Sequence, residues 1–269
     1  MIGGRDLIQR TLSALVMVPV VLGITMLGGP AFAVLWAIAG AGVIYDWARV
    51  ASITPRRPYV MVGIAGLMAG ILALSLSVGG LALPVIVGTA LACGLLARPA
   101  VWSGAGILGA AVACLPVIVL RGEDRLGLSA VLFLYAVVWG TDIGAYFVGR
   151  AVGGFKLAPR LSPNKTWSGA VGGALIGTFA GCGVLLLDGL YFVPALAVLG
   201  LGLSVASQMG DLAESAFKRA FGVKDASQLI PGHGGILDRV DGFMAAGLLA
   251  LVVGLSRDFN APAAGLLLW

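Results

Sequence analysis

Residues 101–120, VWSGAGILGAAVACLPVIVL, form an apolar run without a single charged side chain. A run of about 20 such residues is long enough to cross the hydrocarbon core of a bilayer as a helix. Its glycines, among them Gly104 and Gly109, would weaken a helix in water. In a membrane they permit close contact between helices, so this stretch predicts a transmembrane helix.

The rest of the 269-residue chain agrees with this interpretation, since 59% of its residues are hydrophobic, 11% are charged and the mean hydropathy is +1.04. Soluble domains carry about 25% charged residues. We therefore expect an all-α, polytopic integral membrane protein whose residues 1–269 form a single membrane-embedded domain. The apolar runs predict about nine transmembrane helices, at 11–28, 31–48, 58–77, 80–97, 101–120, 127–148, 168–187, 190–208 and 240–256.

The basic residues indicate which loops face the cytoplasm, because cytoplasmic loops of membrane proteins are enriched in Lys and Arg. With a cytoplasmic N-terminus, fourteen of the 17 basic residues fall on the inside, and only Arg121, Arg125 and Arg257 fall outside. This asymmetry supports the span count and places the two longest polar segments, 149–167 and 209–239, on the cytoplasmic side. It also explains the net charge of +5 without a nucleic-acid partner.

The segment 208–242 contains most of the candidate catalytic and binding residues. Asp211, Glu214, Ser215, Lys218 and Arg219 share one helical face. The turn that follows, Ile230-Pro-Gly-His-Gly-Gly235, is too rich in glycine and proline to continue a helix, and its backbone amides suit a phosphate. Asp238, Arg239 and Asp241 then precede the last span.

Carboxylates at a membrane boundary are costly unless they are paired or bind cations. Asp211 and Asp238 form the leading candidate pair, and hard oxygen ligands of this kind suit Mg²⁺. Lys218, Arg219, Lys224 and Arg239 supply the positive charge that a polyphosphate requires. The structural alternative is a network of salt bridges that only holds the loop together.

The spacing in this segment resembles the signature of the phosphatidate cytidylyltransferase family, the CDP-diacylglycerol synthases. The resemblance rests on Ser215-Ala-Phe-Lys218-Arg219, Lys224-Asp225 and the uninterrupted run Ile230-Pro-Gly-His-Gly-Gly-Ile-Leu-Asp238-Arg239-Val-Asp241. These diagnostic residues cover only about 30 positions.

A second block, residues 138–173, resembles the same family, and there Ser162, Lys165 and Thr166 can contact phosphate. Asn164 and Ser168 depart from the family pattern, which usually has a basic and an acidic residue at these positions, so neither receives a role. Asp142 is expected to face the polar cavity. Asp46 is explained by Arg49 or solvent and stays unassigned.

The resemblance implies transfer of a cytidylyl group from CTP to phosphatidic acid, with pyrophosphate released. It implies that Asp211 and Asp238 hold catalytic Mg²⁺, with Asp142 or Asp241 as further ligands and room for a second cation. Ser215, the four cations of the segment and His233 are expected to bind phosphate, although His233 also suits a turn. The expected partners are CTP, phosphatidic acid, the bilayer and a second copy in a homodimer. The expected location is the bacterial cytoplasmic membrane.

Two rival functions stay open at this point. Another CTP-dependent membrane transferase, such as a lipid-alcohol kinase or an archaeal-type lipid cytidylyltransferase, shares the mixed acidic and basic cluster but should lack the uninterrupted spacing. A transporter or scaffold would place paired charges deep within its spans.

Overall fold

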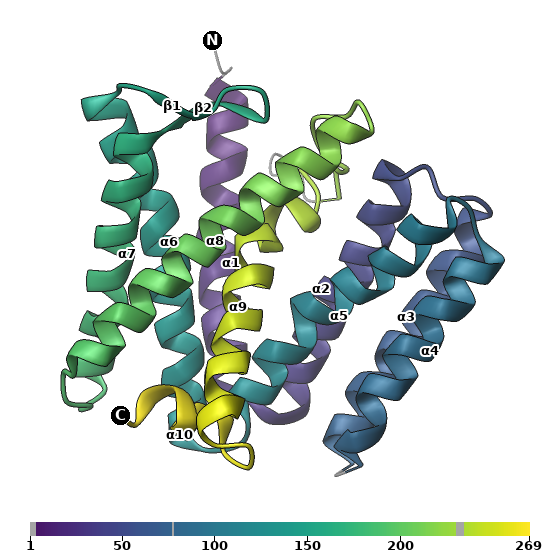
Figure 1. Cartoon of the computed structure of the whole chain (residues 1–269), viewed down its shortest axis with the longest axis horizontal. Helices are drawn as coiled ribbons and strands as arrows, with labels where there is room; N and C mark the ends of the chain where they lie inside the picture. The colour runs from purple at the N-terminus through teal and green to yellow at the C-terminus, as the bar shows by residue number, and fades with distance from the viewer. Residues whose placement is uncertain (1–3, 77, 230–233) are drawn as a thin grey trace. The chain divides into compact units, whose positions relative to one another are not determined.

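The computed structural model describes residues 4–76, 78–229 and 234–269, with side chains from residue 15 onward. It is a predominantly helical membrane fold, and each of the nine predicted spans overlaps one helical segment (Figure 1). Within the described residues, eight segments are long and apolar enough to cross a membrane, and Leu15–Leu27 is the apolar part of the first helix. The prediction of a polytopic all-α protein is confirmed.

The chain divides into two compact units, Met1–Ile118 with Phe221–Val240 and Val119–Ala220 with Asp241–Trp269. The helices that begin in the first unit are α1 (Gly4–Leu27), α2 (Gly29–Val50), α3 (Arg56–Ser75), η1 (Gly79–Leu81), α4 (Ala82–Leu96) and α5 (Ala100–Arg121). The second unit contains α6 (Arg125–Val152), β1 (Lys156–Ala158), β2 (Ser162–Thr166), α7 (Trp167–Leu187), α8 (Pro194–Ala220) and α10 (Pro262–Leu267). Helix α9 (Leu237–Arg257) starts in the first unit and continues in the second.

In the first unit, two loops meet at one end of the helices. The backbones of Thr54 and Arg98 exchange hydrogen bonds of 2.9 Å in both directions, which joins the α2–α3 loop to the α4–α5 loop. The positive-inside argument had assigned both loops to the same side of the membrane. The pairing agrees with that parity.

In the second unit, α6 and α7 lie side by side along most of their length (Figure 1). Glycines of α7 make this possible, since a Cβ atom at Gly173 would lie 2.6 Å from the Thr141 carbonyl oxygen and one at Gly177 would lie 2.5 Å from the Val137 carbonyl oxygen. Such contact between small residues is a common basis of helix association in lipid. The expected role of glycine in close packing is therefore confirmed.

The structure also contains elements that the apolar runs did not predict. The antiparallel strands β1 and β2 form a short hairpin between α6 and α7, and α10 follows the last span. The eighth predicted span, 190–208, is helical only from Pro194, and it continues to Ala220. The polar face at 211–219 thus belongs to the same helix as the apolar span.

At the far end of α7 from the hairpin, Asp188 joins α7 to the start of α6. Its carboxylate accepts hydrogen bonds from Ser129 and, at 3.1 Å, from the exposed guanidinium of Arg125. These two donors hold the pKa of Asp188 below its usual range, with the Ser129 hydroxyl the larger cause.

We expect the contacts of Asp188 with Ser129 and Arg125 to stabilise the protein at neutral pH, and we expect this stabilisation to be lost in acid. A lowered pKa means that the stabilisation is complete above the unfolded-state pKa of about 3.9 and is lost as the pH falls through the folded-state pKa. The measurement is the difference in melting temperature in detergent between the wild type and Asp188→Asn, at neutral pH and below pH 4. A difference that does not shrink in acid would contradict the assignment.

Candidate active site

Three acidic side chains and one lysine come together in the second unit. Lys165, on β2, forms an ion pair with Asp211 on α8. Asp241, in the first turns of α9, interacts electrostatically with Asp211, with Asp142 on α6 and with Lys165. Four separate elements therefore bring these residues to one place, which the sequence had indicated only as two polar segments on the same side.

Small residues allow α8 and α9 to cross closely at this point. A Cβ atom at Gly210 would lie 2.5 Å from the Asp241 carbonyl oxygen, and one at Gly242 would lie 3.1 Å from the carbonyl oxygen of Ser207. Because each glycine neighbours one of the carboxylates in sequence, the helix crossing sets how Asp211 and Asp241 approach each other.

The donor set suits a hard divalent cation. Asp142, Asp211 and Asp241 bring three carboxyl groups to a place where Lys165 supplies one ammonium group. Within the described part of the chain, no three His, Cys, Asp or Glu side chains lie close enough to chelate a metal by themselves. A cation here would complete its shell with phosphate oxygens and water, as Mg²⁺ usually does.

Asp238 lies in the first unit and has a different setting. Its Oδ2 accepts hydrogen bonds from the backbone amides of Gly235, at 2.8 Å, and Ala226, at 3.2 Å. These bonds close the segment that precedes α9. Its predicted role as a metal ligand stays a prediction, since the structure shows the carboxylate as the organiser of this segment.

Asp46 is the residue that sequence reasoning missed. It is completely buried, so solvent does not explain it, and its Oδ2 accepts a hydrogen bond of 2.9 Å from the Leu237 amide at the start of α9. The buried Ser227 lies beside the same carboxylate. A carboxylate within the apolar run of the second span was the available signal, because such a group requires a partner.

The two described glycines of the turn fit around these carboxylates. Gly234 has a φ of 86°, in the left-handed region that favours glycine. A Cβ atom at Gly235 would lie 2.4 Å from Asp46 Oδ2, so a side chain at 235 would collide with the buried carboxylate. Glycine is therefore required at 235 by Asp46 and favoured at 234 by the turn.

Replacing Asp46 should loosen the segment 226–238. We expect Asp46→Ala to lower the free energy of unfolding by about 1.5–3 kcal/mol, the usual worth of a hydrogen bond to a charged group. Asp46→Asn should lose less, because its amide oxygen can still accept from Leu237. Thermal unfolding in detergent measures the order, and equal stability of Asp46→Ala and the wild type would refute this role.

The predicted phosphate-binding cations are in unlike settings. Lys218 pairs with Glu214 at 2.7 Å, and the two side chains are only 13% and 5% exposed. Arg219, Lys224 and Arg239 are exposed, and Ser215 is half-buried. His233 lies outside the described residues, so its predicted role is not addressed.

The candidate residues of the hairpin and of the start of α7 also differ in their burial and contacts. Thr166 is buried and caps α7, because its Oγ1 accepts a hydrogen bond of 3.1 Å from the Gly169 amide. Ser168 donates to the Gly153 carbonyl oxygen, which closes the loop, while Asn164 is exposed. Ser162 is half-buried on β2. Of this group, Lys165 is the side chain that reaches the carboxylates.

Comparison with known proteins identifies the class. The profile of the Cytidylyltransferase family matches residues 8–256, and the chain belongs to this family. It is 42% identical to the phosphatidate cytidylyltransferase of Brucella suis over 258 residues, 93% of each chain. It is 38% identical to that of Pseudomonas aeruginosa over 254 residues, which cover 88% of this chain and 93% of the relative. The match to the phosphatidate cytidylyltransferase of Bacillus subtilis is 44% identical over 133 residues, about half of each chain.

Proposed function

We propose that this protein is a phosphatidate cytidylyltransferase that makes CDP-diacylglycerol and pyrophosphate from CTP and phosphatidic acid. Family membership and relatives of this name support the proposal. The observation that carries it is the meeting of Lys165, Asp142, Asp211 and Asp241 in a membrane-spanning protein. We further propose that residues 1–269 act as one catalytic domain.

In the proposed reaction, a phosphate oxygen of the lipid attacks the α-phosphorus of CTP. The bond from that phosphorus to the oxygen bridging to the β-phosphate breaks, and pyrophosphate leaves with the electron pair. The nucleophile is already anionic, so the protein has little need of a general base. Its task is to offset repulsion between two anions and to stabilise the leaving group.

Mg²⁺ is part of the proposal, with room for a second cation. Asp211 and Asp241 would hold it, with phosphate oxygens and water completing its shell, while Asp142 and Asp238 stay the alternative ligands. When bound, the ion would neutralise charge on the triphosphate. Lys165 already pairs with Asp211 and is suited to bind phosphate beside it, and Lys218, Arg219, Lys224 and Arg239 would attract the anionic substrates.

We place the site on the cytoplasmic face of the bacterial inner membrane, because fourteen of 17 basic residues follow that orientation. CTP would then reach the site from the cytoplasm and phosphatidic acid from the bilayer. The resemblance also implies a homodimer, which mass measurement of the detergent-solubilised protein would test.

The direct test supplies the purified protein with CTP, Mg²⁺ and phosphatidic acid and measures CDP-diacylglycerol and pyrophosphate. Equal amounts of both products are expected, with none when either substrate is omitted. Turnover of diacylglycerol or another lipid alcohol in place of phosphatidic acid would favour the rival kinase function. A transporter would release no pyrophosphate in response to the lipid.

A further inference from the structure

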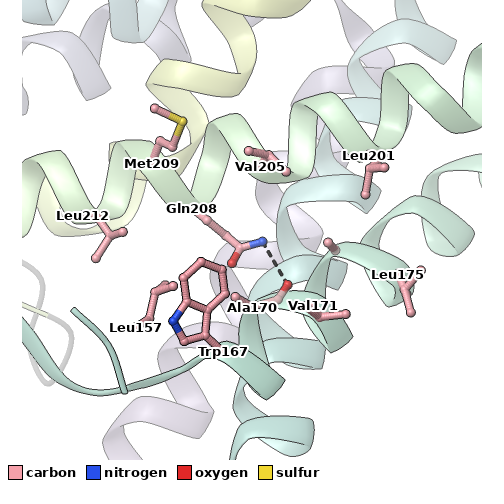
Figure 2. A pocket seen from close by; sticks show the side chains of 11 residues that line it. Leu157, Trp167, Ala170, Val171, Leu175, Leu201, Val205, Gln208, Met209 and Leu212 are labelled. Atoms are coloured by element: carbon pink, nitrogen blue, oxygen red, sulfur yellow. Dashed lines mark hydrogen bonds between the residues drawn. The ribbon is translucent and has the colours of Figure 1, made fainter. Parts of the chain in front are cut away.

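A cavity of about 380 Å³ lies between α7 and α8 in the second unit. Figure 2 shows its two walls, with Trp167, Val171 and Leu175 on α7 and Leu201, Val205 and Leu212 on α8. Its volume is within the range of roughly 300–1,000 Å³ that is usual for small-molecule pockets. The lining is almost entirely apolar, so its occupant should be apolar too.

The single polar side chain of the lining is already engaged. Gln208 Nε2 donates a hydrogen bond of 3.2 Å to the Ala170 carbonyl oxygen, which ties α8 to α7 at the cavity (Figure 2). Trp167, Val171 and Met209 nevertheless stay more than half exposed, at 58%, 56% and 64%. The cavity is therefore open to molecules outside the protein, which in a membrane are lipids.

Two residues of the lining are close in sequence to residues of the candidate active site. Leu212 follows Asp211 directly on α8, and Trp167 comes two residues after Lys165. From Leu212 the lining continues along α8 to Leu201, a distance of about 16 Å at 1.5 Å per helical residue. Lys165 does not line the cavity, but it lies two residues before Trp167 and so brings a positive charge to the same end of α7. An apolar cavity with a positive charge near one end matches a molecule with an anionic head group and a hydrocarbon chain.

We propose that this cavity binds one acyl chain of phosphatidic acid, with the lipid phosphate at the end near Lys165. The proposal rests on the proposed function and adds a subsite for the lipid substrate. A second copy of the chain could also cover an apolar face of spanning helices, and brominated phosphatidic acid would then not quench a tryptophan of the lining. Bulk lipid that fills the cavity without selectivity is the alternative to be tested.

Narrowing the cavity should penalise long acyl chains selectively. Val205→Trp places a large ring in the lining, and Val198→Trp adds the same ring to α8 at a site that is 71% exposed and outside the lining. For Val205→Trp we expect a KM for dioleoyl phosphatidic acid raised about tenfold or more, as for misfits in apolar pockets. Its kcat/KM for dihexanoyl phosphatidic acid, and both constants of Val198→Trp, should stay within about twofold. Equal effects on both lipids, or no effect on either, would overturn the subsite.

A binding measurement separates this inference from the proposed function. Phosphatidic acid with brominated acyl chains should quench the fluorescence of Trp167 at a low mole fraction in detergent, and Trp167→Phe should remove that component. Brominated phosphatidylcholine should quench it much less. Selective quenching without any product would retain the lipid subsite and reject the transferase, whereas equal quenching by both lipids would reject the subsite alone.

Discussion

Asp211→Asn and Asp241→Asn are each expected to reduce kcat by about 10²–10³-fold, the usual cost of removing one preorganised electrostatic group. Each change replaces a carboxyl group near Lys165 by an amide and keeps the size of the side chain. The measurement is CDP-diacylglycerol formation at saturating CTP and lipid, with circular dichroism to confirm intact helices. Glu123→Gln, in the exposed loop before α6, is the control and should keep full activity.

A comparison of Asp241→Asn with Asp238→Asn decides which carboxylates hold the metal. A ligand's loss should raise the Mg²⁺ concentration needed for half-maximal rate, whereas loss of a loop organiser should lower stability instead. We expect Asp241→Asn to behave in the first way and Asp238→Asn in the second, because Asp238 accepts two backbone amides. Near-normal turnover and Mg²⁺ requirement in both Asp211→Asn and Asp241→Asn would remove this pair from the catalytic centre.

Gly177→Leu is expected to have the largest effect on stability. A Cβ atom at 177 would lie 2.3 Å from Thr141 Oγ1 and 2.5 Å from the Val137 carbonyl oxygen, so α7 would have to move away from α6. Overpacking of this kind costs about 1–3 kcal/mol, and more where backbone cannot yield. Thermal unfolding in detergent measures the loss.

Gly183→Leu provides the matched control for this variant. Gly183 is also on α7, and a Cβ atom there would meet nothing within 4 Å. The same side chain is thus added to the same helix without a collision. If the two variants unfolded at the same temperature, the glycine contacts between α6 and α7 would not be what holds these helices together.

The helical fold could be predicted because its signal is local. Each apolar run is as long as the bilayer is thick, and the nine predicted spans correspond to the observed helices within a few residues at most ends. The exceptions are α1, which begins at Gly4, and α8, which continues to Ala220 because its charged residues lie on one face and do not interrupt helical hydrogen bonding. The hairpin at 156–166 is too short and polar to give a signal.

The candidate site could be predicted only in part, since its contacts join residues far apart in the chain. The sequence identified Asp211 and Lys165 separately, but only the fold shows that they form an ion pair. Asp46 contacts Leu237 across 191 residues, a distance over which no spacing rule operates. Thr166 caps α7, a role that the sequence did not indicate, and its contact with phosphate stays a prediction.

The central claim is that a cytidylyl group, and no other part of CTP, is transferred to phosphatidic acid. Two parallel reactions with CTP labelled at either the α- or the γ-phosphorus test it most directly. We predict that the α-label appears in the lipid fraction and that the γ-label appears in pyrophosphate. Transfer of the γ-label to the lipid, with the α-label left in a soluble nucleotide, would contradict the account and identify a kinase.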